Sequence, residues 1–190
     1  MKQSMEALTS SESNEWYTPA EIISLVREVL GEIDLDPASN EIANQVVGAE
    51  EYFSKDGLEL TWHGSVFLNP PYGTSGMQGK FLAKALSEYT QENISQCIVL
   101  TKSVPGYLWY DDMFHVYWMG DICITYDRIS FYKPEWVHNG KIIYPKNAKS
   151  KTASTFWYLG PKPELFEKVF SRLGMVINPI QEYITEYVSK

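Results

Sequence analysis

Apolar residues recur along the chain with helical spacing in some stretches and as short continuous runs in others. The first helical pattern follows Trp16-Tyr17-Thr18-Pro19 and ends at Gly31. Thr18 as N-cap, Pro19 at the first helical position and Glu21 three residues after the cap predict a capping box. A glycine such as Gly31 is the usual residue just past a helix end, so we predict a helix between Pro19 and Gly31.

Strand-like and helix-like patterns then alternate. Strands are predicted to begin at Ile33 and to cover 49–53, 66–68, 96–101, 122–126, 129–132 and 155–159. Further helices are predicted over 40–47, 80–91, 163–173 (with Gly174 as its stop) and 180–188. This order predicts an α/β fold whose sheet is mostly parallel, has helices on both faces, and carries an antiparallel strand pair near the C-terminus.

Length and composition favour one compact domain. A chain of 190 residues with 44% hydrophobic and 14% aromatic residues can bury a substantial core. Residues 1–14 are polar and aperiodic and predict a mobile tail, so the single domain is expected over 15–190. We find neither an apolar run long enough for a membrane helix nor a signal-peptide core, and expect a soluble, intracellular protein without a membrane partner.

Cysteines and histidines give no metal pattern. Cys97 and Cys123 lie within apolar runs, which predicts buried reduced thiols. The three histidines are scattered, and no spacing of Cys and His matches a zinc site. We therefore expect no structural metal.

Charge is unevenly distributed. The net charge of −8 argues against nucleic-acid binding as a property of the whole surface, because phosphate binding depends on Lys and Arg. The segment 133–151 differs: its five lysines and one acid, Glu135, give a net charge of +4. This basic loop is the candidate DNA-contacting insertion, with a solvated loop as the alternative. Its lysines are Lys133, Lys141, Lys146, Lys149 and Lys151.

A second concentration, of aromatic residues, lies within 102–119. Aromatic side chains stack on nucleic-acid bases in some proteins, but they more often pack in the core. We therefore favour core packing for this segment.

Polar groups stand at the ends of two predicted strands. The run 66–68 ends at Asn69-Pro70-Pro71-Tyr72, because proline cannot donate the hydrogen bonds that continue a sheet. The side-chain carbonyl of Asn69 and the backbone carbonyl of Pro70 could accept both hydrogens of an exocyclic amino group, and Tyr72 offers a ring for stacking. A simple turn is the alternative. Asp36, at the end of the first strand, could receive ammonium or hydroxyl groups of a ligand. An Asp-Pro turn or a helix cap is the alternative.

Four motifs in this order resemble those of the phage-type DNA adenine-N6 methyltransferases, over about 15–160. They are Trp16 to Pro19, Asp34 to Ser39, Asp56 to Leu58 with Trp62, and Asn69 to Tyr72. The resemblance implies a class I, Rossmann-like fold that binds S-adenosylmethionine across the carboxyl edge of the sheet. It also implies double-stranded DNA as substrate, a phage or prophage origin, action in the bacterial cytoplasm, and a link to restriction-modification.

Position by position, the resemblance implies a cofactor site, a catalytic group and DNA contacts. Tyr17, Thr18 and Pro19 would line the methionine side of the cofactor, and Asp36, with Pro37, would hold its amino or ribose groups. Asp56 would accept from the cofactor's adenine amino group, and Phe53 would pack on that adenine. The implied catalytic residues are Asn69, Pro70, Pro71 and Tyr72, with Asn69 also near the cofactor; Lys102 joins the basic loop as a DNA contact. Ala38-Ser39-Asn40 replaces the Gly-x-Gly turn of many methyltransferases.

The implied reaction is direct in-line transfer of a methyl group to adenine N6. A base inside a duplex cannot reach a buried cofactor, so the target adenine would flip out of the stack. No covalent intermediate is required, and neither cysteine is expected to act as a nucleophile. Two other kinds of activity remain open: methylation of an amino group of RNA guanine or protein glutamine, and non-catalytic DNA binding by a protein that retains the fold.

Overall fold

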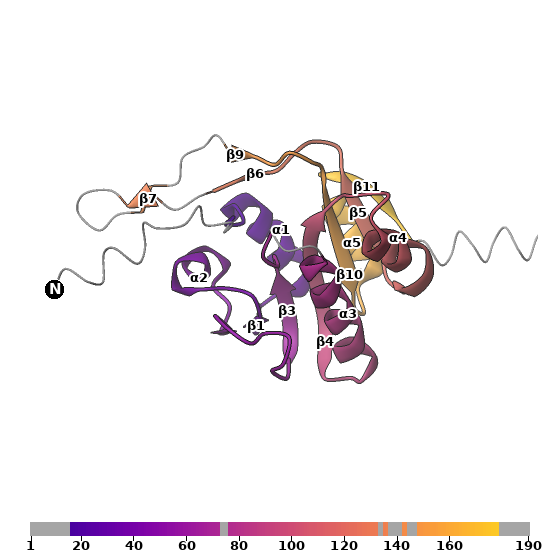
Figure 1. The fold of residues 1–190 in the computed structure, drawn as a ribbon, viewed down its shortest axis with the longest axis horizontal. Coiled ribbons are helices and arrows are strands. Elements are labelled where there is room, and N and C mark those ends of the chain that lie inside the picture. The colour runs from indigo at the N-terminus through magenta and orange to yellow at the C-terminus, as the bar shows by residue number, and fades with distance from the viewer. Residues whose placement is uncertain (1–15, 73–75, 133–134, 137–141, 144–147, 179–190) are drawn as a thin grey trace, which may run out of the picture.

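A seven-stranded sheet forms the centre of the computed structural model, which describes residues 16–72, 76–132, 135–136, 142–143 and 148–178 (Figure 1). The strand order is β11-β5-β10-β4-β3-β1-β2. In chain order these strands are β1 (Leu35–Asp36), β2 (Glu51–Tyr52), β3 (Gly64–Leu68), β4 (Ile94–Lys102), β5 (Ile122–Thr125), β10 (Ser154–Leu159) and β11 (Gly174–Ile177).

The sheet is mixed, so the prediction of a mostly parallel sheet is wrong. The pairs β2–β1, β1–β3 and β3–β4 are parallel, whereas β4–β10, β10–β5 and β5–β11 are antiparallel. The cause is the insertion of β10 between β4 and β5, since it runs opposite to both neighbours. Strand β11 adds a third antiparallel pair, and it begins at Gly174, which the sequence pattern had suggested only as a helix stop.

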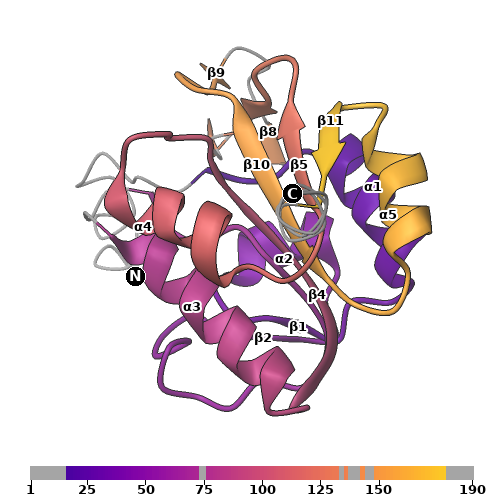
Figure 2. The ribbon, with the colours of Figure 1, turned by 90° about the vertical axis from the view of Figure 1, so that its right-hand side faces the viewer.

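Helices cover both faces of this sheet, as predicted. Helices α1 (Ala20–Leu30) and α5 (Pro163–Phe170) pack on one face, and α3 (Met77–Thr90), α4 (Leu108–Asp112) and the π-helix Met113–Tyr117 pack on the other (Figure 2). Successive β-strand residues point to opposite faces. In β4, Ile98 therefore joins the α1–α5 core, while its neighbours Cys97 and Val99 join the α3–α4 core. Both cysteines are buried and free.

Aromatic residues of the segment 102–119 contribute to the second core. The rings of Tyr110 and Trp118 lie 5.3 and 5.5 Å, centroid to centroid, from the ring of Trp157 in β10, and all three side chains are buried. The Tyr110 hydroxyl lies 2.8 Å from Thr155 Oγ1. Core packing, the favoured interpretation, is confirmed for these residues. Tyr107 and Tyr117, by contrast, are exposed.

The start of α1 differs from the prediction in a way that matters for the site. Pro19 is the N-cap, and no side chain caps the helix, so the predicted capping box is wrong. The Thr18 hydroxyl instead accepts a hydrogen bond from Asn69 Nδ2 over 3.2 Å. The helix ends as predicted before Gly31, whose φ of 83° favours glycine.

The remaining elements complete the frame around the sheet edge. Helix α2 (Glu41–Val47) is capped by Asn40, whose Oδ1 accepts from the backbone N–H groups of Ile42 and Ala43. Strands β6 (Ser130–Phe131) and β9 (Ala148–Lys149) pair as a ribbon that extends past the sheet, and β7 (Glu135–Trp136) pairs with β8 (Ile142–Ile143) (Figure 1). The predicted helix 180–188 lies outside the described residues. Within the described ranges, no helix is long and apolar enough to span a membrane.

Candidate active site

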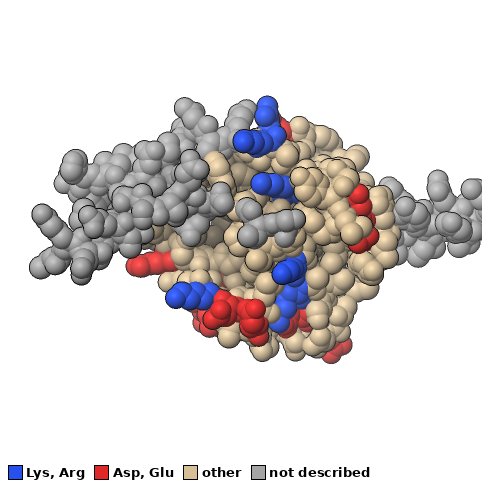
Figure 3. All heavy atoms as spheres, in the orientation of Figure 1, with Lys and Arg blue, Asp and Glu red and all other residues tan. Residues whose placement is uncertain are grey.

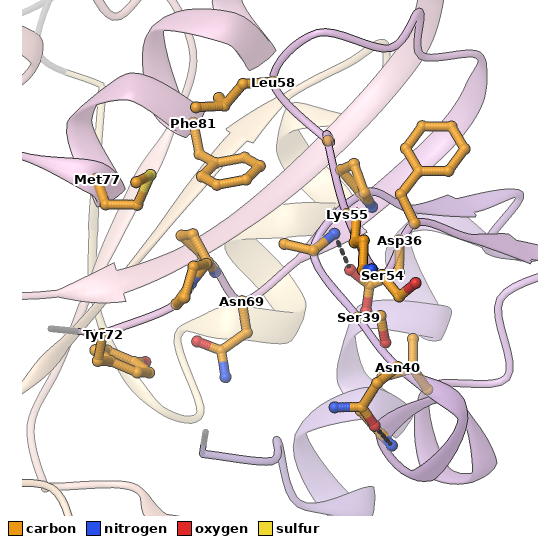
Figure 4. Close-up of a pocket in the computed structure, with 18 of the residues that line it drawn as sticks. Asp36, Ser39, Asn40, Ser54, Lys55, Leu58, Asn69, Tyr72, Met77 and Phe81 are labelled. Carbon is orange, nitrogen blue, oxygen red and sulfur yellow. Dashed lines mark hydrogen bonds between the residues drawn. The ribbon is translucent and has the colours of Figure 1, made fainter. Parts of the chain in front are cut away.

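A cavity of about 400 Å³ opens at the carboxyl ends of β1 and β3, where ligands bind in open α/β sheets. Asn69 lies between Tyr72 on one side and the Asp36–Asn40 loop on the other (Figure 4). The volume falls within the range of small-molecule sites. The wall is formed by Trp16 to Thr18, Asp36 to Asn40, Ala43, Val47, Phe53 to Glu59, Asn69 to Tyr72, Met77 and Phe81.

The Asn69 carboxamide is held through its nitrogen, Nδ2, whereas its oxygen, Oδ1, makes no hydrogen bond. Its Nδ2 donates to the backbone carbonyl of Trp16 over 2.9 Å and to Thr18 Oγ1 over 3.2 Å. These two bonds fix the amide orientation, because only Nδ2 can donate. The Oδ1 atom is buried and has no hydrogen-bond partner, and it is directed toward the side of Tyr72 (Figure 4). A buried acceptor without a partner is costly, so this oxygen is suited to a hydrogen donor on a ligand.

Tyr72 presents a fixed aromatic ring beside that oxygen. Its side chain is buried, and the ring of Phe131 meets it edge-on at 5.9 Å between centroids. Lys102 Nζ lies over the ring, 4.9 Å from its centroid, which is a cation–π distance. Burial raises the pKa of the Tyr72 phenol well above its usual value, so the ring remains neutral at physiological pH. The arrangement offers a neutral flat surface with a cation on it.

Asp36 places a buried carboxyl group across the cavity from Tyr72. It is 3% exposed, and Ala38 N–H donates to its Oδ1 over 3.1 Å. Burial raises the pKa of Asp36 to about 7, and the Ala38 hydrogen bond only partly opposes this shift. No cationic group contributes to that pKa among the described residues. A ligand that carries an ammonium or hydroxyl donor would supply the missing stabilisation of the carboxylate.

The turn Asp56–Leu58 forms part of the cavity wall beside the Asp36–Pro37 loop. Trp62 is buried and its Nε1 donates to the Gly57 carbonyl over 2.7 Å, which explains why the tryptophan accompanies this motif. Asp56 has a φ of 58° and an exposed side chain. Gly57 packs against the Asp36–Pro37 loop so closely that an added Cβ would lie 1.9 Å from the Pro37 carbonyl oxygen.

Gly57→Ala is therefore expected to push the Asp56 turn away from the Asp36 loop. Overpacking of this kind costs roughly 1–3 kcal/mol, and we expect the Kd for S-adenosylmethionine, the cofactor that the motif resemblance implies, to rise by at least about tenfold. Titration calorimetry measures it. Gly120→Ala is the matched control, because its Cβ would also lie 1.9 Å from a carbonyl oxygen, that of Tyr158. The control should lose stability and keep its affinity for the cofactor; equal affinity in both variants would contradict this role of Gly57.

The structure brings most of the predicted site residues together. The predicted residues found around the cavity are Tyr17, Thr18, Asp36, Pro37, Phe53, Asp56, Asn69, Pro70, Pro71 and Tyr72. Pro19 is not among the residues of the cavity wall and is instead the N-cap of α1. Lys102 also lies outside the cavity wall, although it contacts Tyr72. Lys133, Lys141 and Lys146 lie outside the described residues, whereas Lys149 ends β9 and Lys151 is exposed.

Several residues of the site were not found from the sequence. Asn40 had no predicted ligand role, yet its Nδ2 donates to the Tyr17 hydroxyl over 3.1 Å at the cavity wall. Met77 and Phe81 add an apolar wall from α3. Phe131 reaches Tyr72 from a strand nearly sixty residues later in the chain. Only Asn40 had a local signal, as the polar residue that ends the small-residue loop; the others depend on contacts between distant segments.

An acid, an amide and an aromatic ring thus surround one cavity at the carboxyl edge of an α/β sheet, the place where open α/β sheets bind nucleotide cofactors and other small ligands. A family model described as DNA N-6-adenine-methyltransferase (Dam) matches residues 6–158, and the chain belongs to this family. The family predicted from the four motifs is thus confirmed, and the protein is a DNA adenine-N6 methyltransferase. Members of such a family take the methyl group from S-adenosylmethionine. A search of curated proteins gives no match.

The described residues contain no group of acidic, His and Cys side chains that could hold a metal ion.

Proposed function

We propose that the protein methylates adenine N6 in double-stranded DNA by direct in-line displacement on a flipped-out base at Asn69 and Tyr72. The observation that carries the proposal is the buried, unpartnered Oδ1 of Asn69. An exocyclic amino group supplies the hydrogen donor that this atom lacks. A base in a duplex cannot reach an atom at the wall of a cavity, and so the adenine must leave the stack.

The cavity fits the cofactor by its chemistry. S-adenosylmethionine, when bound, supplies an electrophilic methyl group on a sulfonium. Asp36 would hold its amino or ribose groups, and Asp56 its adenine amino group. Tyr17 and Thr18 would lie along its methionine side, and Phe53 would pack on its adenine. Support comes from the buried carboxyl of Asp36, which has a raised pKa and no cationic neighbour that contributes to it.

The residues at the other end of the cavity would orient the adenine. Asn69 Oδ1 and the Pro70 carbonyl accept the two hydrogens of N6, which directs the nitrogen lone pair toward the methyl group and stabilises the positive charge that develops on nitrogen. Tyr72 stacks on the base, and Pro71 keeps the turn rigid. Two existing hydrogen bonds hold the Asn69 amide, so its orientation requires no reorganisation when the base arrives.

Contacts with DNA phosphates would come from cations near this end of the cavity. Lys and Arg side chains lie at the top and centre of the face in Figure 3 and beside acidic side chains at its lower left, and Asp and Glu side chains lie mostly at its lower and right edges. Lys102 is the best-placed described cation, because its Nζ already lies over the Tyr72 ring. We assign Lys102 and the basic loop 133–151, with Lys133, Lys141, Lys146, Lys149 and Lys151, to the DNA contact.

Lys102→Met is expected to weaken DNA binding and to lower its salt dependence. Loss of one phosphate contact reduces the slope of log Kobs against log salt by about 0.9. Lys168→Met is the control, since Lys168 is exposed on α5 and does not line the cavity. Fluorescence anisotropy over a salt series measures both. If the two variants share the wild-type slope, Lys102 makes no phosphate contact.

The substrate is tested by product analysis. The protein is incubated with cofactor labelled in its methyl group and with DNA, RNA and protein together; the three are then separated and digested. We expect label only in DNA, as N6-methyladenine. Label in RNA guanine or in protein glutamine would overturn the proposal.

A further inference from the structure

The ribbon formed by β6 and β9 contacts the candidate catalytic group Asn69 to Tyr72 through Phe131. Phe131, the last residue of β6, is 3% exposed, and its ring contacts the Tyr72 ring edge-on. It packs in the core on the α1–α5 face together with Tyr72. Phe131 therefore limits where the Tyr72 ring can lie.

The next residue, Tyr132, pairs with the segment that holds Asn69. Its backbone N–H donates to the Tyr17 carbonyl over 3.0 Å, and its carbonyl accepts from the Tyr17 N–H over 2.9 Å. The two neighbours of Tyr17 are the acceptors for Asn69 Nδ2, namely the Trp16 carbonyl and Thr18 Oγ1. The Tyr17 hydroxyl in turn accepts from Asn40 at the cofactor end of the cavity. One short segment thus joins the ribbon, Asn69 and the cofactor loop.

We propose that Phe131 and the backbone of Tyr132 are positioning residues, which set the Tyr72 ring and the Asn69 amide for the target base and couple cofactor binding to DNA binding. The inference rests on the proposed function. A displacement of the ribbon by DNA would move Tyr17, and with it both the acceptors of Asn69 and the contact with Asn40. Coupling between two binding sites is reciprocal, so S-adenosylmethionine should strengthen DNA binding by the same factor as DNA strengthens cofactor binding.

Phe131→Leu tests the ring contact. A small misplacement of reacting groups lowers rates strongly, and we expect kcat to fall at least about tenfold while the KM for DNA stays within about twofold. The fluorescence increase of 2-aminopurine at the target position, which reports base flipping, should also fall. Phe131→Tyr retains the ring and should keep most of the wild-type kcat. Phe170→Leu is the matched control for stability, because Phe170 is a fully buried phenylalanine on α5.

Tyr132→Pro tests the backbone pair, and Tyr132→Ala is its control because alanine keeps the N–H. The Kd of the cofactor product S-adenosylhomocysteine is measured with and without DNA. We expect DNA to tighten this Kd in the wild type and in Tyr132→Ala, and to have no such effect in Tyr132→Pro. Thermal melting is recorded for every variant.

Two outcomes would overturn the inference: a Phe131→Leu variant with the kcat and 2-aminopurine signal of Phe170→Leu, or equal coupling in Tyr132→Pro and Tyr132→Ala. Because Tyr132→Pro keeps the Phe131 ring, it still tests the coupling of cofactor and DNA binding if Phe131→Leu does not fold. Failure of the proposed function looks different, since the wild type would then form no N6-methyladenine in DNA.

Discussion

Asn69→Ala is expected to lower kcat for DNA methylation by about 10²–10³-fold, the usual effect of removing one group that stabilises charge in a transition state. The substitution deletes the only side-chain acceptor proposed for the adenine amino group, Oδ1, which is buried and without a partner. It also deletes the donor to Trp16 and Thr18. Single-turnover rates with labelled cofactor separate this effect from changes in binding.

Two further variants make that result specific. Asn69→Asp keeps an acceptor and loses the donor, so its kcat should lie between the wild type and Asn69→Ala. Asn44→Ala also removes a carboxamide with two hydrogen bonds, to the backbone of Ala49, but Asn44 does not line the cavity. The Asn44 variant should melt earlier and keep its kcat. A wild-type rate in Asn69→Ala would contradict the assigned role.

Asp36→Asn is expected to raise the Kd for S-adenosylmethionine by roughly 10- to 100-fold. The basis is the loss of a charged hydrogen-bond partner, which is worth about 1.5–3 kcal/mol. Calorimetry measures the affinity, and circular dichroism shows that the variant is folded. An unchanged Kd would place the cofactor elsewhere.

The same carboxyl group predicts how cofactor affinity depends on pH. Burial raises the pKa of Asp36 to about 7 in the folded protein, above its ordinary value, so this group lowers stability progressively as pH rises from about 4 to 7. A bound ammonium or hydroxyl donor favours the ionised form, and binding therefore releases a proton below pH 7. As the pH rises toward 7, the Kd should therefore fall by up to about tenfold per pH unit; above pH 7 it should level off. Asp36→Asn should remove this dependence between pH 5.5 and 7.5.

Local sequence patterns predicted the parts of the fold that depend on neighbouring residues. Gly31 ends α1, and β3 stops just before Asn69 and the two prolines. Parallel order follows for β2, β1, β3 and β4, where strands and helices alternate. Because the carboxyl ends of these strands meet at one edge, Asp36 and Asn69 were expected to share a site, and both line the same cavity.

What the sequence did not predict depends on contacts between distant segments. No local pattern shows that β10 inserts between β4 and β5, and this insertion makes the sheet mixed. Thr18 has the residue type of a helix cap, but its hydroxyl accepts a hydrogen bond from the amide of Asn69, which is fifty-one residues away in the chain. The contact of Phe131 with Tyr72 and the position of Lys102 over that ring likewise appear only once β4, β3 and the ribbon are assembled.

The two ends of the cavity have separate proposed roles. At one end lies Asp36, a buried carboxyl group with a raised pKa, which a ligand donor would help to ionise. At the other end, Trp16 and Thr18 hold the Asn69 amide by hydrogen bonds, and Phe131 packs against the Tyr72 ring. Preorganisation of this kind is the main way in which a protein without a covalent intermediate can accelerate group transfer.

The most direct test of this account is a crystal structure of the protein with S-adenosylhomocysteine and DNA that contains the target adenine. We predict that the adenine lies outside the helix stack against the Tyr72 ring, with N6 at about 2.7–3.2 Å from Asn69 Oδ1. An adenine that remains paired in the duplex, or an N6 that lies away from Asn69, would contradict the proposed site.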